Sequence, residues 1–166
     1  MTVLSILTAP NDKLTMQAKP VTDVSQIQGL IDDLLETMYN TEDGIGLAAT
    51  QVGSSEAVVV IDISENRDEP LILVNPEIIS GEEKAKGQEG CLSVPGYYAD
   101  VERFSKVTVE ALDRNGEAIS ITSDDFLAIV MQHEIDHLKG KLFIEYLSPL
   151  KQQMALKKVK KTIKNG

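Results

Sequence analysis

Residues 123–140 read Ser-Asp-Asp-Phe-Leu-Ala-Ile-Val-Met-Gln-His-Glu-Ile-Asp-His-Leu-Lys-Gly, and this stretch predicts a helix that carries chemistry. Apolar residues and both histidines share one face, Ser123 and the two aspartates after it predict a cap with an acidic first turn, and Gly140 suits the end. Residues i and i+4 stand one turn apart, so His133 and His137 can reach one metal ion. Glu134, beside the first of them, can accept a proton from metal-bound water. The alternative is a helix with packed or solvated histidines and a surface carboxylate.

The rest of the chain predicts mostly strands and one earlier helix. Apolar residues recur at helical spacing over 24–40, and Asp23 stands where an N-cap would. The segment 44–53 holds three glycines and predicts a loop or strand that lets a backbone approach closely. Strand patterns occur at 57–63, 71–75, 107–112 and 118–122, the last two joined by a turn at 113–116. We therefore expect an α+β fold in which antiparallel or mixed sheets pack around a central metal-ligand helix, with an N-terminal and a C-terminal helix.

Length and composition favour one domain spanning residues 1–166. Hydrophobic residues make up 42% of the chain, enough for a buried core, and the net charge of −10 argues against binding nucleic acid with the whole surface. The single cysteine, Cys91, excludes an intramolecular disulfide and is typical of a reducing compartment. No apolar run approaches the roughly 18 residues that span a membrane, and the first residues lack a charged signal region. We expect a cytoplasmic protein without membrane contact.

A hydrolytic metal site keeps three protein ligands and leaves one position open for water. The chain has only two histidines, so the third ligand must be another residue type. Cys91, in a Gly-Cys-Leu-Ser-Val-Pro segment, is the favoured candidate, although a lone cysteine is more often a small buried apolar residue. Glu145 is the alternative, and it would make the protein a zincin-like endopeptidase. The segment 141–146 around Glu145 is expected to be extended.

Three segments, in this order, resemble the three motifs of the peptide deformylase family. They are Gly-Ile-Gly-Leu-Ala-Ala-Thr-Gln at 44–51, Glu-Gly-Cys-Leu-Ser at 89–93 and His-Glu-Ile-Asp-His at 133–137. Matching flanks extend the resemblance over nearly the whole chain. It implies a metal-dependent hydrolase that removes the N-formyl group from the formyl-methionine of nascent polypeptides. Metal-bound hydroxide would attack the formyl carbon, with Glu134 as general base and then general acid.

The same resemblance implies a set of site residues. The metal would be held by Cys91, His133 and His137, with Fe²⁺ as the expected physiological ion and Zn²⁺, Ni²⁺ or Co²⁺ also possible. The side chain of Gln51 and the backbone N–H of Leu92 would stabilise negative charge on the formyl oxygen. The peptide would lie as a strand against Gly44, Ile45 and Gly46. The methionine pocket would be walled by Phe126, Ile129, Val130 and His133.

Some members of the family carry an arginine shortly after the cysteine motif that helps to hold the peptide backbone. Here Tyr97 and Tyr98 occupy that stretch and the first arginine is Arg103, which leaves peptide affinity open. A protein that binds formyl-peptides without turnover is therefore a further alternative. Glu89 and Arg103 are expected to form an ion pair near the cysteine, unless they are merely a surface pair.

The C-terminal segment 150–166 is a separate basic element, because lysines follow Glu145 and acidic residues do not. It predicts an amphipathic helix whose apolar residues are Leu150, Met154, Val159 and Ile163, or else a frayed tail. An enzyme that acts on nascent chains could dock on ribosomal RNA through these lysines.

Overall fold

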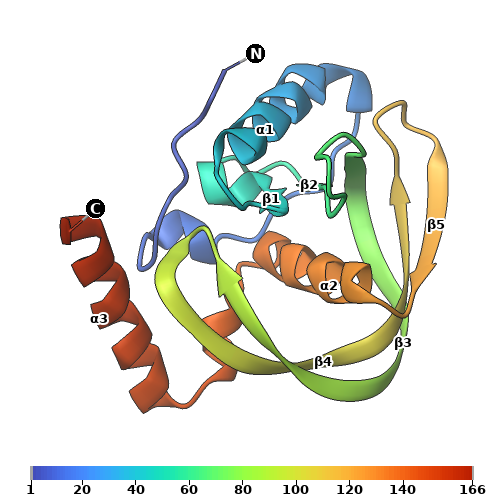
Figure 1. Cartoon of the computed structure of the whole chain (residues 1–166). Helices are drawn as coiled ribbons and strands as arrows, with labels where there is room; N and C mark the ends of the chain where they lie inside the picture. Colours follow the sequence, from blue (N-terminus) through green and yellow to red (C-terminus); the bar gives the residue numbers. More distant parts are fainter. Residues whose placement is uncertain (1, 166) are drawn as a thin grey trace.

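The computed structural model describes residues 2–165, and the side chains of residues 2–164, as one α+β unit (Figure 1). Helix α2 (Phe126–Leu138) lies at its centre, and a five-stranded antiparallel sheet curves around it. Helices α1 (Gln28–Asn40) and α3 (Pro149–Asn165) lie outside, at opposite sides. The expected fold class and the central position of the metal-ligand helix are confirmed.

The sheet runs in sequence order, β1 to β5, and each strand pairs with the next. Its strands are β1 (Gly46–Ala48), β2 (Val58–Ile61), β3 (Leu71–Cys91), β4 (Val94–Leu112) and β5 (Ala118–Ser123). All pairs are antiparallel, so the mixed alternative does not apply. β3 and β4 form one long hairpin, of which the sequence predicted only the parts nearest β2 and β5. Residues 82–88 of that hairpin are all exposed, so they carry no alternation of apolar and polar side chains.

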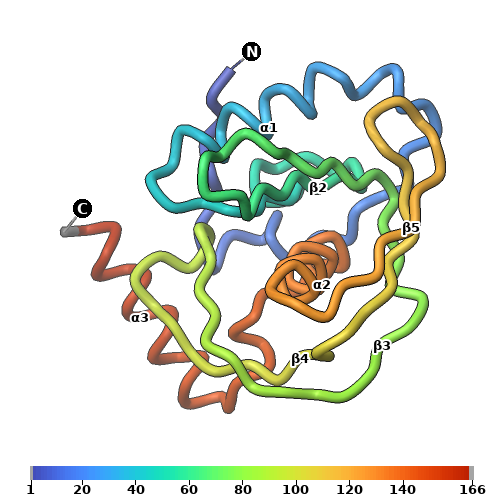
Figure 2. The backbone as a smooth tube through the Cα atoms, turned by 45° about the vertical axis from the view of Figure 1, so that its right-hand side comes forward, coloured from blue at the N-terminus to red at the C-terminus, as the bar shows by residue number. Residues whose placement is uncertain are grey.

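Irregular pairing bends the long hairpin around α2. The register between β3 and β4 shifts at three places, near Val74, Ile78 and Glu89, and such bulges bend a strand and increase its twist. Figure 2, which views α2 nearly end-on, shows both strands curving past the helix. The last shift lies next to the turn at Leu92 and Ser93, so the bend brings the end of the hairpin back toward the histidines.

Short 3₁₀ helices complete the chain: η1 (Asp12–Thr15), η2 (Val24–Ile27), η3 (Ala49–Val52) and η4 (Phe143–Tyr146). Asp23 is the predicted cap, and its side chain accepts the Ser25 N–H, but the first turn of the predicted helix is η2. The extended conformation expected for 141–146 is wrong, because η4 forms there. At α2 the cap is Asp125 and no acidic residue lies in the first turn, which corrects the predicted cap.

Apolar residues of α2 and the sheet form the core that fixes the site. Met131 and Ile135 are buried against β2, β3 and β4, and each such side chain contributes about 1.5–3 kcal/mol. Ile31 and Leu34 of α1 pack in a second cluster on the other face of β2. α2 is thus fixed on one face of the sheet, and α1 covers the other face at β2.

α3 is an ordered helix that packs on β4, so the frayed alternative is wrong. Its buried face consists of Ala155 and Val159. Leu150, Met154 and Ile163 are exposed, so of the four predicted apolar contacts only Val159 is made. None of the described helices combines the length and the apolar composition that a membrane span requires.

Candidate active site

Three ligand atoms converge where the end of β3 meets α2. The Nε2 atoms of His133 and His137 lie 3.2 Å apart, and Cys91 Sγ lies 3.3 Å from the Nε2 of His137. All three atoms lie within 4.8 Å of one another. Glu145 is not part of this group: its carboxylate caps η4 by accepting the Leu142 N–H. The endopeptidase arrangement is therefore excluded, and Cys91 is the third candidate ligand.

The two histidines differ in the direction in which their surroundings shift the pKa. Burial lowers the pKa of His137 well below its ordinary value, so its imidazole is neutral and presents a lone pair. Burial also opposes charge on His133, but hydrogen bonds with Cys91 and Glu89 outweigh it and raise the pKa. Nδ1 of His133 lies 2.9 Å from a carboxylate oxygen of Glu89, and a hydrogen bond between them requires the proton on Nδ1. Nε2 of His133 then faces His137 as the ligand nitrogen. Two nitrogens and one sulfur facing a common point suit a divalent ion with an open fourth position.

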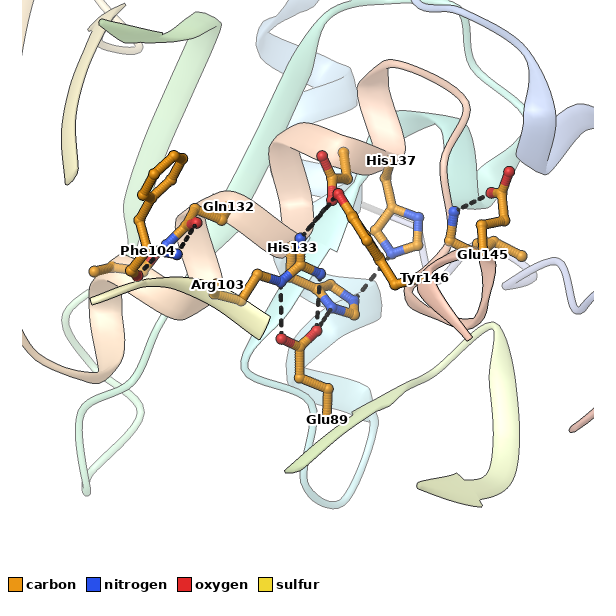
Figure 3. A network of polar contacts seen from close by, with 11 residues as sticks. Glu89, Arg103, Phe104, Gln132, His133, His137, Glu145 and Tyr146 are labelled. Carbon is orange, nitrogen blue, oxygen red and sulfur yellow. Dashed lines mark hydrogen bonds and ion pairs between the residues drawn. The ribbon is translucent and has the colours of Figure 1, made fainter. Parts of the chain in front are cut away.

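A buried ion-pair network holds His133 in place (Figure 3). The Arg103 guanidinium donates to both oxygens of Glu89, at 2.8 and 2.9 Å, and its Nη1 donates to Asp136. The Tyr146 hydroxyl donates to the same Asp136 carboxylate at 2.7 Å. Burial favours the protonated form of Glu89, yet the hydrogen bonds from Arg103 and His133 outweigh it and lower the pKa. The predicted Glu89–Arg103 pair is confirmed as a buried one.

Asp136 and Tyr146 were not predicted for this network, and the sequence carries no signal for them. Asp136 comes from α2 itself and Tyr146 from η4, and only the tertiary fold brings them to Arg103. The network joins β3, β4, α2 and η4, and it keeps Glu89 charged next to a ligand. Breaking such a buried pair typically destabilises a protein by about 3–5 kcal/mol.

Glu134 lies beside the ligand atoms with a buried, partly unpaired carboxylate. Its Oε1 has no hydrogen-bond partner among the described residues. Its Oε2 packs against Gly46 of β1, where an added Cβ would lie only 2.4 Å away. Burial raises the pKa of Glu134 to about 7, the value that suits proton exchange near neutral pH. A surface carboxylate, the alternative for Glu134, is excluded by this burial.

Gln51 reaches the same place from η3. The Thr50 hydroxyl donates to the carbonyl oxygen of His137 at 3.0 Å, which ties η3 to the ligand helix. The Gln51 side chain is 1% exposed; its Oε1 accepts the Ala48 N–H, and its Nε2 donates to Ser93 Oγ at 3.0 Å and approaches Cys91 Sγ at 3.5 Å. The Oε1 contact fixes the orientation of the amide, so Nε2 is a donor aimed at the centre.

A cleft of about 370 Å³ opens above this centre. Its lining includes every predicted substrate-binding residue: Gly44, Ile45, Gly46, Phe126, Ile129, Val130 and His133. Leu92, Cys91 and Glu134 also line it, whereas Gln51 and His137 lie behind it. Phe126 is 56% exposed and therefore lies at the mouth.

The residues at positions 97 and 98 have different roles in the structure. Tyr98 lines the cleft and is 60% exposed, with its ring packed on Gly90, where an added Cβ would lie 2.5 Å from a ring carbon. Tyr97 instead packs in the cluster beneath α3. The alternation of side chains along β4 separates the two, and the sequence did not show which one would face the cleft.

Comparison with known proteins agrees with this geometry. The family described as polypeptide deformylase matches residues 3–153. Peptide deformylase 1 of Vibrio vulnificus is 70% identical over 161 residues, covering 97% of this chain and 96% of that protein. Peptide deformylase 2 of Vibrio cholerae is 68% identical over 165 residues, with 99% and 98% covered. The crystal structure of a peptide deformylase from Legionella pneumophila superimposes with a TM-score of 0.94 at 47% identity, covering 98% of this chain and 96% of that one. The chain belongs to the polypeptide deformylase family.

Proposed function

We propose that this chain removes the N-formyl group from peptides that begin with formyl-methionine, at the cleft above Cys91, His133 and His137. One observation carries the assignment: a buried carboxylate, Glu134, lines the cleft together with Cys91 and His133, whose ligand atoms converge with that of His137. The reaction is hydrolysis of a linear amide, which releases formate and a free α-amino group.

Cys91, His133 and His137 would hold one divalent ion, and the family makes Fe²⁺ the physiological candidate, with Zn²⁺, Ni²⁺ or Co²⁺ able to replace it. Such an ion supplies Lewis-acid activation of a water molecule, whose pKa it lowers toward about 7. The Glu89–Arg103 pair supports this role, because a carboxylate on Nδ1 orients His133 and raises the basicity of its Nε2.

Side-chain and backbone groups of the chain would transfer the proton and stabilise the developing negative charge. Glu134 accepts a proton from the attacking water and returns it to the departing amine, for which a pKa of about 7 is suited. The Gln51 amide and the Leu92 backbone N–H donate to the formyl oxygen as negative charge develops on it. The fixed orientation of the Gln51 amide supports its assignment, because Nε2 already points toward Cys91 and can exchange one of its present contacts for the formyl oxygen without the amide turning over.

The peptide would bind as an added strand along residues 44–46. β1 pairs with β2 on one side only, and Gly44, Ile45 and Gly46 line the cleft on the other. An extended peptide can hydrogen-bond to such an edge. The methionine side chain would lie against Ile129 and Val130, with Phe126 and Tyr98 at the mouth.

The lysines of α3 would help to bring the enzyme to nascent chains in the cytoplasm by docking on ribosomal RNA. Ala155 and Val159 hold the helix on the body while its lysines remain exposed, in particular Lys157, Lys158, Lys160 and Lys161. Docking of this kind is expected to weaken steeply with salt. Replacing those four lysines by Gln should abolish salt-sensitive co-sedimentation with ribosomes and leave peptide turnover unchanged. Co-sedimentation that survives the replacement would refute the docking.

The function is tested by formate release from formyl-Met-Ala-Ser, using protein purified without oxygen and loaded with Fe²⁺. We expect rapid release, no reaction with the acetylated peptide, and no cleavage of internal peptide bonds. Bound metal without formate release would refute the deformylase assignment and favour a protein that only binds formyl-peptides.

A further inference from the structure

Arg67, in the loop between β2 and β3, holds the segment that leads from α1 into β1. Its Nη1 donates to the carbonyl oxygens of Thr41 and Glu42, at 2.9 and 3.3 Å. Its Nη2 donates to those of Met38 and Gly44, both at 3.1 Å. One planar guanidinium therefore fixes four carbonyl groups of residues 38–44, an arrangement that the compact ammonium of lysine cannot reproduce.

The loop around Arg67 is itself rigidly anchored. The Asp62 carboxylate accepts the Tyr39 hydroxyl from α1 and the backbone N–H groups of Ser64 and Glu69 from both ends of the loop. The guanidinium carbon of Arg67 lies 5.5 Å from the centroid of the Tyr39 ring, within the range of a cation–π contact. Arg67 also has φ +55°, a left-handed conformation that a non-glycine residue adopts only where its surroundings hold it.

The segment held in this way is the one that would bind substrate backbone. The Gly44 carbonyl oxygen accepts a hydrogen bond from Arg67, and the Ile45 carbonyl oxygen accepts one from the Asp62 N–H at 2.8 Å. Both residues line the cleft directly before β1. The loop that carries Asp62 and Arg67 thus fixes the position of this edge relative to Glu134, although the loop does not itself line the cleft.

We propose that Arg67 is a positioning residue for the peptide part of the substrate, acting through Gly44 and Ile45. This inference rests on the proposed deformylase function. Arg67 keeps the edge at residues 44–46 in the conformation that pairs with an extended peptide. Its effect should therefore grow with the length of peptide that follows the formyl-methionine, and be small for a substrate that ends there.

A purely structural role predicts a different outcome. The contact with Met38 places a cation at the C-terminal end of α1, which alone stabilises a helix. If that were the whole role, loss of Arg67 would lower the melting temperature and reduce activity on long and short substrates by the same factor.

The test compares kcat/KM for formyl-Met-Ala-Ser with kcat/KM for formyl-methionine amide in wild type, Arg67→Ala and Arg67→Lys. The ratio of the two values does not depend on the fraction of active enzyme, so it is insensitive to partial unfolding. We expect Arg67→Ala to lower the ratio roughly tenfold, mainly through KM for the tripeptide, as expected for the loss of one or two backbone hydrogen bonds. Arg67→Lys should lower it on the order of threefold, because a point charge replaces only part of the fork.

Arg114→Ala is the matched control, because Arg114 also contacts α1, through Gln28 and Asp32, but does not line or brace the cleft. Its ratio should equal that of wild type. An unchanged ratio in Arg67→Ala would overturn the proposal; if that variant does not fold, an unchanged ratio in Arg67→Lys would overturn it. Wild-type protein that releases no formate from either substrate would instead refute the proposed function.

Discussion

Replacing Gly46 by Ala perturbs Glu134, the proposed general base, while leaving the three candidate ligands in place. A Cβ at position 46 would lie 2.4 Å from Oε2 of Glu134, and 2.9 and 3.1 Å from its Cδ and Cγ. Ordinary contact begins at about 3.4 Å, so the carboxylate must withdraw by about 1 Å. A displacement of about 1 Å at a reacting group typically lowers the rate on the order of 100-fold. We therefore expect kcat for a formyl-Met tripeptide to fall by about that factor.

Stability should change far less than activity in Gly46→Ala. The clash involves the end of one side chain rather than backbone, so the overpacking should cost about 1 kcal/mol, at the low end of such changes. The measurements are kcat, the metal content per chain and the melting temperature. Two other glycines of the sheet serve as controls. An added Cβ at Gly87 would have no atom within 4 Å, and the three atoms nearest to one at Gly81 all belong to the ring of Phe104. Gly87→Ala should resemble wild type, and Gly81→Ala should lose stability without losing kcat. A Gly46→Ala enzyme within threefold of wild-type kcat would refute the placement of Glu134.

Three further substitutions test the third metal ligand, the donor to the formyl oxygen and the anchor of the Arg67 loop. Cys91→Ala should lose most of its bound metal on dialysis, measured by elemental analysis, whereas a site completed by a different residue would keep it. Gln51→Ala should lower kcat by 10²–10³-fold, about 3–4 kcal/mol of transition-state stabilisation, with little change in metal content; a loss below fivefold would remove Gln51 from the mechanism. Burial favours the protonated form of Asp62, but hydrogen bonds from Ser64 and Tyr39 outweigh burial and lower the pKa of this carboxyl group. The ionised Asp62 therefore stabilises the fold above the unfolded pKa of about 3.9, and this stabilisation is lost as pH falls through the folded pKa. Asp62→Asn should therefore lower the free energy of unfolding by about 2 kcal/mol at pH 7 and by much less at pH 3, measured by urea unfolding; an equal loss at both pH values would contradict this.

The sequence predicts the site more completely than the fold around it. Apolar periodicity gives α2, although its cap is Asp125, and the spacing of His133 and His137 follows directly from helix geometry, so these features are local. The order of the three motifs gives Cys91 and Gln51 through the family resemblance. Both are placed by contacts between distant segments, and their distances could not come from spacing alone.

What the sequence missed depends on tertiary packing. The middle of the β3–β4 hairpin has exposed side chains along most of its length, so it lacks the apolar alternation that predicts strands. The buried face of α3 is set by where β4 lies, and it uses Ala155 in place of the larger Met154. Arg67 donates to backbone carbonyl oxygens of residues that lie 23 to 29 positions away in the sequence. Any residue can supply a backbone carbonyl, so no sequence pattern predicts these contacts.

The proposed role of Glu134 is proton transfer at a centre held by Cys91, His133 and His137. It is tested most directly by formate release from metal-loaded Glu134→Gln, an isosteric change that removes the base and leaves the ligands. With metal content equal to that of wild type, kcat should fall by about 10²–10⁴-fold. Formate release within tenfold of the wild-type rate, with the same metal bound, would contradict it.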